Sequence, residues 1–312
     1  MVLKGKKDLL SIHDLSCAEV QQILELAAEL KAKQKKGIEH HILKGKTLGM
    51  IFEKASTRTR VSFEVGMWQL GGMGLFLSSR DMQIGRGEPI KDTARVLSRY
   101  VDGIMIRTFS HDIVTELAQY ATVPVINALT DLQHPCQALA DIFTVMEHKG
   151  NLKGLKMTYI GDCNNMANSL MHACAKVGMD ITIAAPQEYA PNEVIVAEAV
   201  ADAALTGSKI TICTDPLEAA KDADVLYTDV WASMGQEAEQ QIRAKVFANY
   251  QVNADTLKVA KPDAIILHCL PAHRGEEITD EAIESKQSAV FDQAENRLHV
   301  QKAIMALLMG DI

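Results

Sequence analysis

The sequence predicts an α/β fold made of two doubly wound parallel-sheet lobes joined by interlobe helices, and three observations favour it. The length of 312 residues is enough for two domains at roughly 100–200 residues each. Short runs rich in β-branched and other apolar residues alternate with helical patterns, which is typical of parallel βα units. A long helical pattern near the middle of the chain separates two such series.

The first series occupies the N-terminal half. Ser16 and Glu19 have the spacing of a capping box, and apolar residues at helical intervals follow them, which predicts an amphipathic helix. Pro135 suits the first turn of a second helix at 135–147, which leads into the C-terminal half. The four strands expected between these helices are 47–53, 74–78, 103–107 and 123–127.

The second series follows Lys149-Gly150-Asn151. The last segment, 296–310, has the pattern of a helix, and we expect this helix to pack back across the first lobe. We therefore expect domains at 1–148 and 149–312, with the C-terminal helix returning to the first domain. The strands expected in the second series are 156–161, 180–184, 209–214, 225–230, 264–270 and 289–291.

Composition excludes several classes of protein. With 47% hydrophobic and 23% charged residues, the chain is neither fibrous nor disordered. A net charge of -8 gives no global attraction to nucleic acid or to a membrane surface, so we expect neither partner. Six cysteines without paired spacing favour free thiols in a reducing compartment. Because no apolar stretch has the length of a membrane span or the pattern of a secretion signal, we expect a cytoplasmic protein.

Parallel sheets bind ligands at the carboxyl ends of their strands, and the first strand is followed by Ser-Thr-Arg-Thr-Arg at 56–60. Hydroxyl groups, guanidinium groups and the free N–H groups of a helix start together form an anion cradle. The segment lacks the Gly-x-x-x-x-Gly-Lys frame of a nucleotide P-loop, so we expect a small phosphate as ligand. The alternative is an ordinary helix N-cap with solvated arginines.

Four more residues in the first lobe could add donors. Arg107 ends a predicted strand, where it could bind phosphate or a carbonyl oxygen, or pair on the surface. His134 and Gln137 lie near a helix start and could stabilise an oxyanion, although His134 could also simply cap the helix. The polar, glycine-containing stretch 78–88 has the composition of a mobile loop, and Gln83 is its candidate contact residue.

Polar residues also follow strands of the second lobe. The segment that begins at Gly161 has one glycine where a dinucleotide fingerprint has three, which disfavours NAD as a cofactor. The paired Asn164 and Asn165 could bind a polar small molecule or shape a turn. Asp229, with Ser233 four residues later, could hold an amino group, although an Asp at this place could also cap a helix.

The segment His268-Cys269-Leu270-Pro271 allows three interpretations, because its Cys could be a covalent nucleophile, a metal ligand or a polar contact. The two histidines and one cysteine within 268–273 lack a fourth obvious ligand for a closed zinc site, so we expect no metal. The spacing alone also allows a cysteine nucleophile that is activated by a neighbouring histidine.

Seven segments, taken together and in order, resemble the motifs of the aspartate/ornithine carbamoyltransferase family. They are STRTR at 56–60, Arg107, HPCQ at 134–137, GDCNNMANS at 161–169, DVWASMG at 229–235, HCLPAHRG at 268–275 and FDQAENR at 291–297. The second-lobe motifs resemble those of members that use ornithine rather than aspartate. One departure is Cys163, where a small residue such as glycine is commoner in the family.

The resemblance implies transfer of a carbamoyl group from carbamoyl phosphate to the δ-amine of L-ornithine, with no cofactor. It makes 1–148 the carbamoyl-phosphate-binding domain and 149–312 the ornithine-binding domain. It also implies a homo-oligomer, a trimer or a multiple of trimers, because Gln83 would reach the site of a neighbouring subunit. Since ornithine supplies the nucleophile, Cys269 need not attack the substrate.

The resemblance also assigns site residues. Those implied to bind carbamoyl phosphate are Ser56, Thr57, Arg58, Thr59, Gln83, Arg107, His134, Pro135, Cys136, Gln137, Cys269, Leu270 and Arg297. Those implied to bind ornithine are Asn165, Asp229, Ser233 and Met234, and those implied to act in catalysis are Arg107, His134, Asp229 and Cys269. Two alternatives are a carbamoyltransferase for another amine such as putrescine, and a non-catalytic small-molecule-binding protein on the same fold.

Overall fold

A computed structural model describes residues 8–233, 235 and 237–311 of the chain. The chain divides into two compact units, one formed by Met1–Ala140 with Glu295–Ile312 and the other by Asp141–Ala294. The chain passes from the first unit to the second within helix α5 (Pro135–Lys149) and returns within helix α12 (Val290–Met309).

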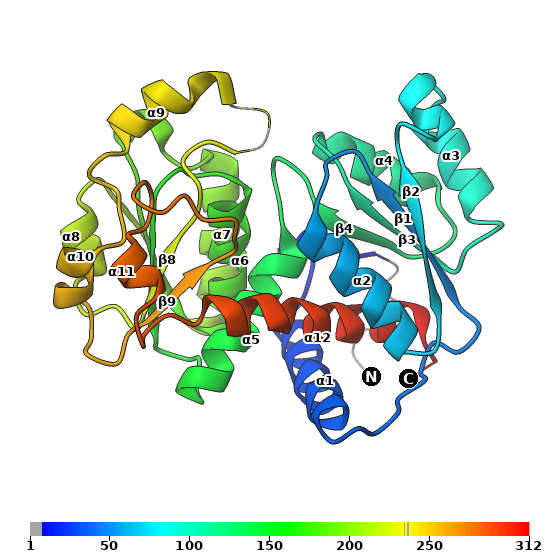
Figure 1. The fold of residues 1–312 in the computed structure, drawn as a ribbon, viewed down its shortest axis with the longest axis horizontal. Helices are drawn as coiled ribbons and strands as arrows, with labels where there is room; N and C mark the ends of the chain where they lie inside the picture. The colour runs from blue at the N-terminus through cyan, green and yellow to red at the C-terminus, as the bar shows by residue number, and fades with distance from the viewer. Residues whose placement is uncertain (1–7, 234, 236, 312) are drawn as a thin grey trace. The chain divides into compact units, whose positions relative to one another are not determined.

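The first unit contains a parallel four-stranded sheet in the order β2-β1-β3-β4 (Figure 1). Strands β1, β3 and β4 are almost wholly buried, as expected for parallel strands covered on both faces, whereas β2 forms an edge with several exposed residues. The strands are β1 (Thr47–Phe52), β2 (Met73–Ser78), β3 (Gly103–Arg107) and β4 (Val125–Leu129). The helices are α1 (Cys17–Lys35), α2 (Thr57–Gln69), the 3-10 helix η1 (Gln83–Arg86), α3 (Ile90–Leu97) and α4 (His111–Tyr120).

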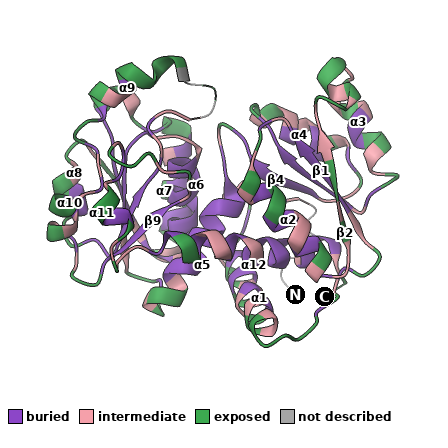
Figure 2. Cartoon of the chain, viewed as in Figure 1, coloured by how far each residue is buried: buried purple, intermediate pink, exposed green. Residues whose placement is uncertain are grey.

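The second unit contains a parallel five-stranded sheet in the order β7-β6-β5-β8-β9, whose central strands are buried (Figure 2). Its strands are β5 (Lys156–Ile160), β6 (Asp180–Ala184), β7 (Ile210–Cys213), β8 (Val225–Thr228) and β9 (Ile265–His268). Its helices are α6 (Asn165–Val177), η2 (Gln187–Tyr189), α7 (Glu193–Thr206), α8 (Pro216–Ala220), η3 (Glu237–Glu239), α9 (Gln240–Val246), α10 (Ala254–Val259) and α11 (Asp280–Ile283).

Both sheets reverse their direction of winding at one point, so both units are doubly wound as predicted. The reversal lies between β1 and β3 in the first unit and between β5 and β8 in the second. Ligands bind outside the carboxyl ends of the strands at such a switch point. The residues that follow β1, β3, β5 and β8 are therefore placed where a ligand binds.

The predicted strand 289–291 is wrong. Only Ser288 pairs with β9, in a single bridge to Ile266, and α12 begins at Val290. A three-residue apolar run fits the first turn of a helix as well as a strand, and Phe291 is 66% exposed, as a solvent-facing helical residue can be. The C-terminal helix consequently starts six residues earlier than the predicted 296, at Val290.

Other predicted strand ends differ by one or two residues. The predicted strand 123–127 is β4 at 125–129, because Pro124 has no N–H group to donate to the ladder, and only its carbonyl oxygen accepts from Ile104 N. The predicted strands 225–230 and 264–270 end at Thr228 and His268, which form the last pair of the ladder between β8 and β9. The capping box of Ser16 and Glu19 at the start of α1 is confirmed.

The C-terminal helix packs on the first unit through a buried ammonium group. Lys302 on α12 is 0% exposed, and its Nζ donates to Gln34 Oε1 on α1 at 2.8 Å and to Gln69 Oε1 on α2 at 2.9 Å. It also donates to His40 Nε2 at 3.1 Å, while His40 Nδ1 faces the Ile38 carbonyl oxygen at 2.8 Å. These acceptors are uncharged, and burial lowers the pKa of Lys302 to about 8.

Two further observations concern the whole described chain. All six cysteines carry free thiols. Among the residues that the structure describes, no helix combines the length and the apolar character needed to cross a bilayer.

The lowered pKa of Lys302 predicts a stability that rises with pH. Above pH 8 the folded protein loses the proton of Lys302 while the unfolded chain still binds it, so unfolding takes up a proton and becomes less favourable. Between pH 8 and 10 the free energy of unfolding should rise by about 2 kcal/mol relative to Lys302→Met. Urea unfolding at several pH values measures this difference. The exposed Lys44→Met is the control, and an equal pH slope for Lys302→Met and the wild type would contradict the prediction.

Candidate active site

The carboxyl end of β1 leads into the first turn of α2, which forms a cationic helix start. Ser56 is the N-cap in an extended conformation, and its Oγ accepts a hydrogen bond from Thr59 N at 3.1 Å. Thr57 is exposed and Arg58 is half-buried, so both remain reachable by a ligand. The N-terminal end of a helix carries partial positive charge, to which Arg58 adds a full charge. The arrangement suits a small anion.

A buried guanidinium group joins this helix start to two other helices of the first unit. Arg297 on α12 donates from Nη1 to Gln137 Oε1 on α5 at 2.6 Å and from Nη2 to Thr59 Oγ1 at 3.2 Å. Arg297 is 2% exposed, and Gln137 and Thr59 are equally buried. Both acceptors are uncharged, so these bonds orient the guanidinium group without neutralising it.

His134 lies in the same positively charged environment. Its side chain is buried, and its pKa is lowered well below the ordinary value, first by burial and then by the positive charges of Arg297, Arg107 and Arg58. The imidazole is therefore neutral near pH 7, and it can donate one hydrogen bond without adding charge. Of the other candidates, Arg107 is buried at the end of β3.

Pro135 and Cys136 form the first turn of α5. Pro135 is the first helical residue, where its missing N–H group costs nothing. Cys136 Sγ donates to the Asn127 carbonyl oxygen at 3.5 Å, and burial raises the pKa of this thiol to about 12, so the side chain is an uncharged packing element. Gln83 takes part in none of these contacts, because its exposed side chain lies on η1 after the edge strand β2.

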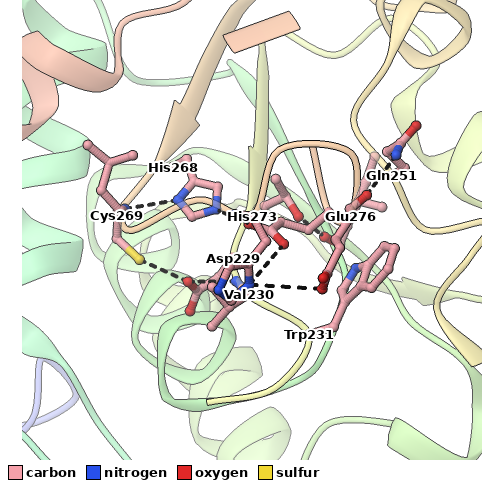
Figure 3. A network of polar contacts seen from close by, with 12 residues as sticks. Asp229, Val230, Trp231, Gln251, His268, Cys269, His273 and Glu276 are labelled. Carbon is pink, nitrogen blue, oxygen red and sulfur yellow. Dashed lines mark hydrogen bonds and ion pairs between the residues drawn. The ribbon is translucent and has the colours of Figure 1, made fainter. Parts of the chain in front are cut away.

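In the second unit, Asp229 follows β8 and meets residues that follow β5 and β9. The thiol of Cys269 donates to Asp229 Oδ1 at 3.1 Å, and Figure 3 shows the sulfur directed at this carboxylate. Val230 N donates to the same oxygen at 2.8 Å, and Asn164 Nδ2 donates to Oδ2 at 2.8 Å. Asp229 is thus a buried, oriented acceptor, which is suited to holding a cationic amino group.

Asn164 belongs to the asparagine pair considered from the sequence, but the family resemblance assigned a ligand role only to Asn165. Asn164 is the N-cap of α6, and its Oδ1 accepts from Met166 N at 2.8 Å while its Nδ2 orients Asp229. The predicted ligand residue Asn165 is the first residue of α6 and is half-buried. Ser233 is half-buried as well, and Met234 lies outside the described residues. The feature of the sequence that could have singled out Asn164 is its position as the N-cap residue directly before α6.

The turn after β9 is held by a buried His–Glu pair. His268 Nδ1 accepts from Leu270 N at 2.9 Å, so Nε2 carries the proton and donates to Glu277 Oε1 at 3.0 Å. Glu277 Oε1 also accepts from His273 N at 2.6 Å, and neither His268 nor Glu277 is exposed. Leu270 has φ 56°, a conformation that costs roughly 1–2 kcal/mol, and this network supports it.

A second buried pair connects the segments after β5 and β8. Arg243 on α9 donates to Asp162 Oδ2 at 3.0 Å and to the Trp231 carbonyl oxygen at 2.9 Å. Burial raises the pKa of Asp162 to about 6, although Arg243 acts in the opposite direction. This connection fixes the backbone two residues after Asp229.

Two groups of described side chains in the second unit have the composition of a metal site, His273 with Glu276 and Glu277, and a group that includes Asp229. Ligand atoms of Asp229, His268 and Cys269 lie within 4.8 Å of one another. Both ring nitrogens of His268 are already in hydrogen bonds, so a metal ion there would have to break one of them. The hydrogen bonds explain the placement of this histidine without a metal.

Two family models match the chain. The aspartate/ornithine carbamoyltransferase carbamoyl-P binding domain matches residues 7–147. The aspartate/ornithine carbamoyltransferase Asp/Orn binding domain matches residues 153–308.

Individual relatives match along nearly the entire chain. The ornithine carbamoyltransferase of Syntrophotalea carbinolica is 62% identical over 305 residues, which is 98% of this chain and 100% of the relative. A solved ornithine carbamoyltransferase from Pyrococcus furiosus has a TM-score of 0.95 at 57% identity, covering 98% of each chain. The ornithine transcarbamoylase of Giardia lamblia, at 33% identity, still has a TM-score of 0.89 over 99% of each chain.

The buried position of Glu277 predicts a large stability loss when its charge and acceptors are removed. Glu277→Leu leaves the Nε2–H of His268 and the N–H of His273 without their acceptor, so the free energy of unfolding should fall by about 3 kcal/mol. Glu277→Gln keeps one acceptor oxygen and should lose about 1 kcal/mol. Urea unfolding measures both. The neighbouring Glu276→Gln serves as a control with little expected change, and an equal loss for Glu276→Gln and Glu277→Leu would refute the assignment.

Proposed function

The chain belongs to the aspartate/ornithine carbamoyltransferase family, and from this premise we propose that it transfers the carbamoyl group of carbamoyl phosphate to the δ-amine of L-ornithine. The products are L-citrulline and phosphate. Residues 1–148 act as the carbamoyl-phosphate-binding domain and residues 149–312 as the ornithine-binding domain, with the C-terminal helix in the first. The observation that carries the proposal is the Asp229 carboxylate, oriented by Asn164 and Cys269 to receive an amine.

Carbamoyl phosphate binds at the helix start of α2. Ser56, Thr57, Arg58 and Thr59 surround its phosphate group, together with Arg107 and the loop residue Gln83. His134, Gln137 and Arg297 contact the carbamoyl end, and Pro135 and Cys136 shape the turn that presents His134. The neutral His134 imidazole donates a hydrogen bond to the carbonyl oxygen, on which negative charge develops during attack.

Ornithine binds in the second unit. Asp229 receives the δ-amino group, and Asn165, Ser233 and Met234 hold the rest of the molecule, next to Cys269 and Leu270. An alkylamine has a pKa of about 10, so the amine must lose a proton before it can attack. Asp229, with the thiol of Cys269 hydrogen-bonded to it, orients the amine, and its carboxylate accepts this proton as a general base.

The reaction needs no covalent enzyme intermediate. The amine nitrogen forms a bond to the carbonyl carbon, the bond from that carbon to the phosphate oxygen breaks, and phosphate leaves with its electron pair. The nitrogen then releases its remaining surplus proton to the departing phosphate. Arg107 and His134 stabilise the oxyanion, and positioning and electrostatics supply the catalysis without a cofactor.

The functional protein is a trimer of identical subunits, or a multiple of trimers, in which Gln83 reaches the site of a neighbour. The edge strand β2 supports this assembly, because Met73, Leu75 and Phe76 are 55%, 42% and 36% exposed. A parallel edge strand with such apolar exposure is unusual and suits a protein interface. The free thiols suit a reducing, cytoplasmic location.

An assay of carbamoyl transfer with ornithine, putrescine and aspartate tests the activity. The wild type should form product with ornithine and should show little turnover with the other two amines. Asp229→Asn removes the charge that holds the amine, so kcat/KM for ornithine should fall about 100-fold while the KM for carbamoyl phosphate changes little. Product from putrescine alone would favour a different amine as substrate. A folded wild type without turnover would favour a binding protein.

Mixing inactive variants tests the shared site. Arg58→Gly and Gln83→Ala should each be inactive alone, and activity should return when the two are unfolded and refolded together, because mixed trimers contain sites with both native residues. The matched control is Arg58→Gly mixed with Arg107→Gly, which are contributed by the same subunit and should give no recovery. Recovery in neither mixture would contradict the contribution of Gln83 to a neighbour.

A further inference from the structure

Gln293 is a buried residue of the FDQAENR segment to which the proposed function assigns no role. It lies near the start of α12 and is 1% exposed. Its Oε1 accepts a hydrogen bond from His268 N at 2.9 Å, and its Nε2 donates to Asp141 Oδ1 at 2.7 Å and to the Tyr227 hydroxyl oxygen at 3.2 Å. Because each end of the amide has a partner of the matching kind, the orientation of the amide is fixed.

The oxygen of this amide completes the outer edge of strand β9. This strand is the last of its sheet, and on its outer side Ile266 exchanges backbone hydrogen bonds of 2.8 and 2.9 Å with the segment 287–289. His268, two residues later, presents its N–H group to the same side. The neighbouring backbone no longer follows the edge there, because α12 begins at Val290. The side chain of Gln293 therefore supplies the acceptor that the backbone does not.

The end of β9 sets the position of the turn that carries Cys269. The His268 ring closes this turn, because its Nδ1 accepts from the backbone N–H two residues later at 2.9 Å. The thiol of Cys269 donates to Asp229 Oδ1 at 3.1 Å (Figure 3). The Tyr227 hydroxyl group, which Gln293 also contacts, belongs to β8, two residues before Asp229. Gln293 thus connects the two strands whose following residues form the Cys269–Asp229 pair.

We propose that Gln293 is a positioning residue for the second substrate: it fixes the end of β9 so that the thiol of Cys269 meets the Asp229 carboxylate that receives the amine. This inference rests on the proposed role of Asp229 in binding ornithine. It assigns the positioning to the acceptor oxygen of the amide. The amide nitrogen, bonded to Asp141 and Tyr227, holds that oxygen in place.

Four variants test the proposal. Gln293→Met keeps the volume and removes the acceptor, and Gln293→Asn keeps an amide that is one methylene shorter, so that its oxygen falls short of His268 N. Gln293→Glu keeps the acceptor oxygen, and its second oxygen can share a proton with Asp141. Thr158→Val is the matched control, because it removes a buried hydrogen bond of the same unit, from Thr158 Oγ1 to the Ala219 carbonyl oxygen at 2.7 Å.

The position of Cys269 is measured by the rate at which iodoacetamide alkylates it, followed by mass spectrometry, with Cys17 of the same protein as the internal reference. A thiol that donates to a carboxylate keeps its proton, and only the thiolate reacts, so a displaced turn speeds alkylation. For each protein we would also measure the melting temperature, kcat, the KM of ornithine, and the affinity for inorganic phosphate by calorimetry.

Gln293→Met and Gln293→Asn should each raise the alkylation rate of Cys269 relative to Cys17 about fivefold and lower kcat/KM for ornithine about tenfold, while phosphate affinity stays unchanged. Gln293→Glu should resemble the wild type in alkylation and in kinetics. Thr158→Val should lower the melting temperature and leave alkylation and kinetics unchanged. A merely structural role of Gln293 would not produce this difference from the control.

Wild-type alkylation of Cys269 in folded Gln293→Met or Gln293→Asn would overturn the inference. Equal defects in Gln293→Glu and Gln293→Met would overturn it as well, because the acceptor oxygen would then not be the group that positions the turn. If Gln293→Met does not fold, the comparison of Gln293→Asn with Gln293→Glu still decides the question. Absence of turnover in the wild type would instead overturn the proposed function, and the alkylation rates read the positioning role independently of turnover.

Discussion

The hydrogen bonds from the Arg297 guanidinium to Gln137 and Thr59 join three helices of the first unit around one buried positive charge. Burial of His134, and then that charge with those of Arg107 and Arg58, lower the pKa of its imidazole well below the ordinary value and keep it neutral near pH 7. The start of α2 adds the partial positive charge of a helix N-terminus, so the first unit gathers several positive groups that suit an anion. The first unit thus concentrates buried positive charge in one small region, although the chain as a whole has a net charge of -8.

The second unit uses the opposite arrangement. A buried carboxylate, Asp229, is held by an amide, a thiol and a backbone N–H group, so its charge is oriented by donors of modest strength. His268 and Glu277 support the turn that carries the thiol, and Arg243 supports the segment after Asp229. In both units, therefore, uncharged or paired neighbours fix the direction of the charged group, and in the second unit this group follows a strand at the switch point of its sheet.

Much of this arrangement could be predicted from the sequence, because it follows from local pattern. Apolar runs marked the parallel strands, and the polar residues that follow them marked Ser56, Arg107 and Asp229. The supporting residues could not be found in this way. Glu277 belongs to no motif, and the partners of Glu277 and Gln293 are set by how separate segments pack. The three-residue run 289–291 was misassigned because so short an apolar segment does not distinguish a strand from a helix start.

The discontinuity of the first unit has a consequence for biosynthesis. Its strands all come from the first 140 residues, but Arg297 and Lys302 come from the helix at the other end of the chain. During translation, the early segment emerges before the C-terminal helix, which carries Arg297 and Lys302 and completes the core of this unit. The ribosome must therefore release the chain at least as far as Lys302 before this unit can reach its native structure, and a nascent chain stalled earlier presents an incompletely covered sheet to chaperones.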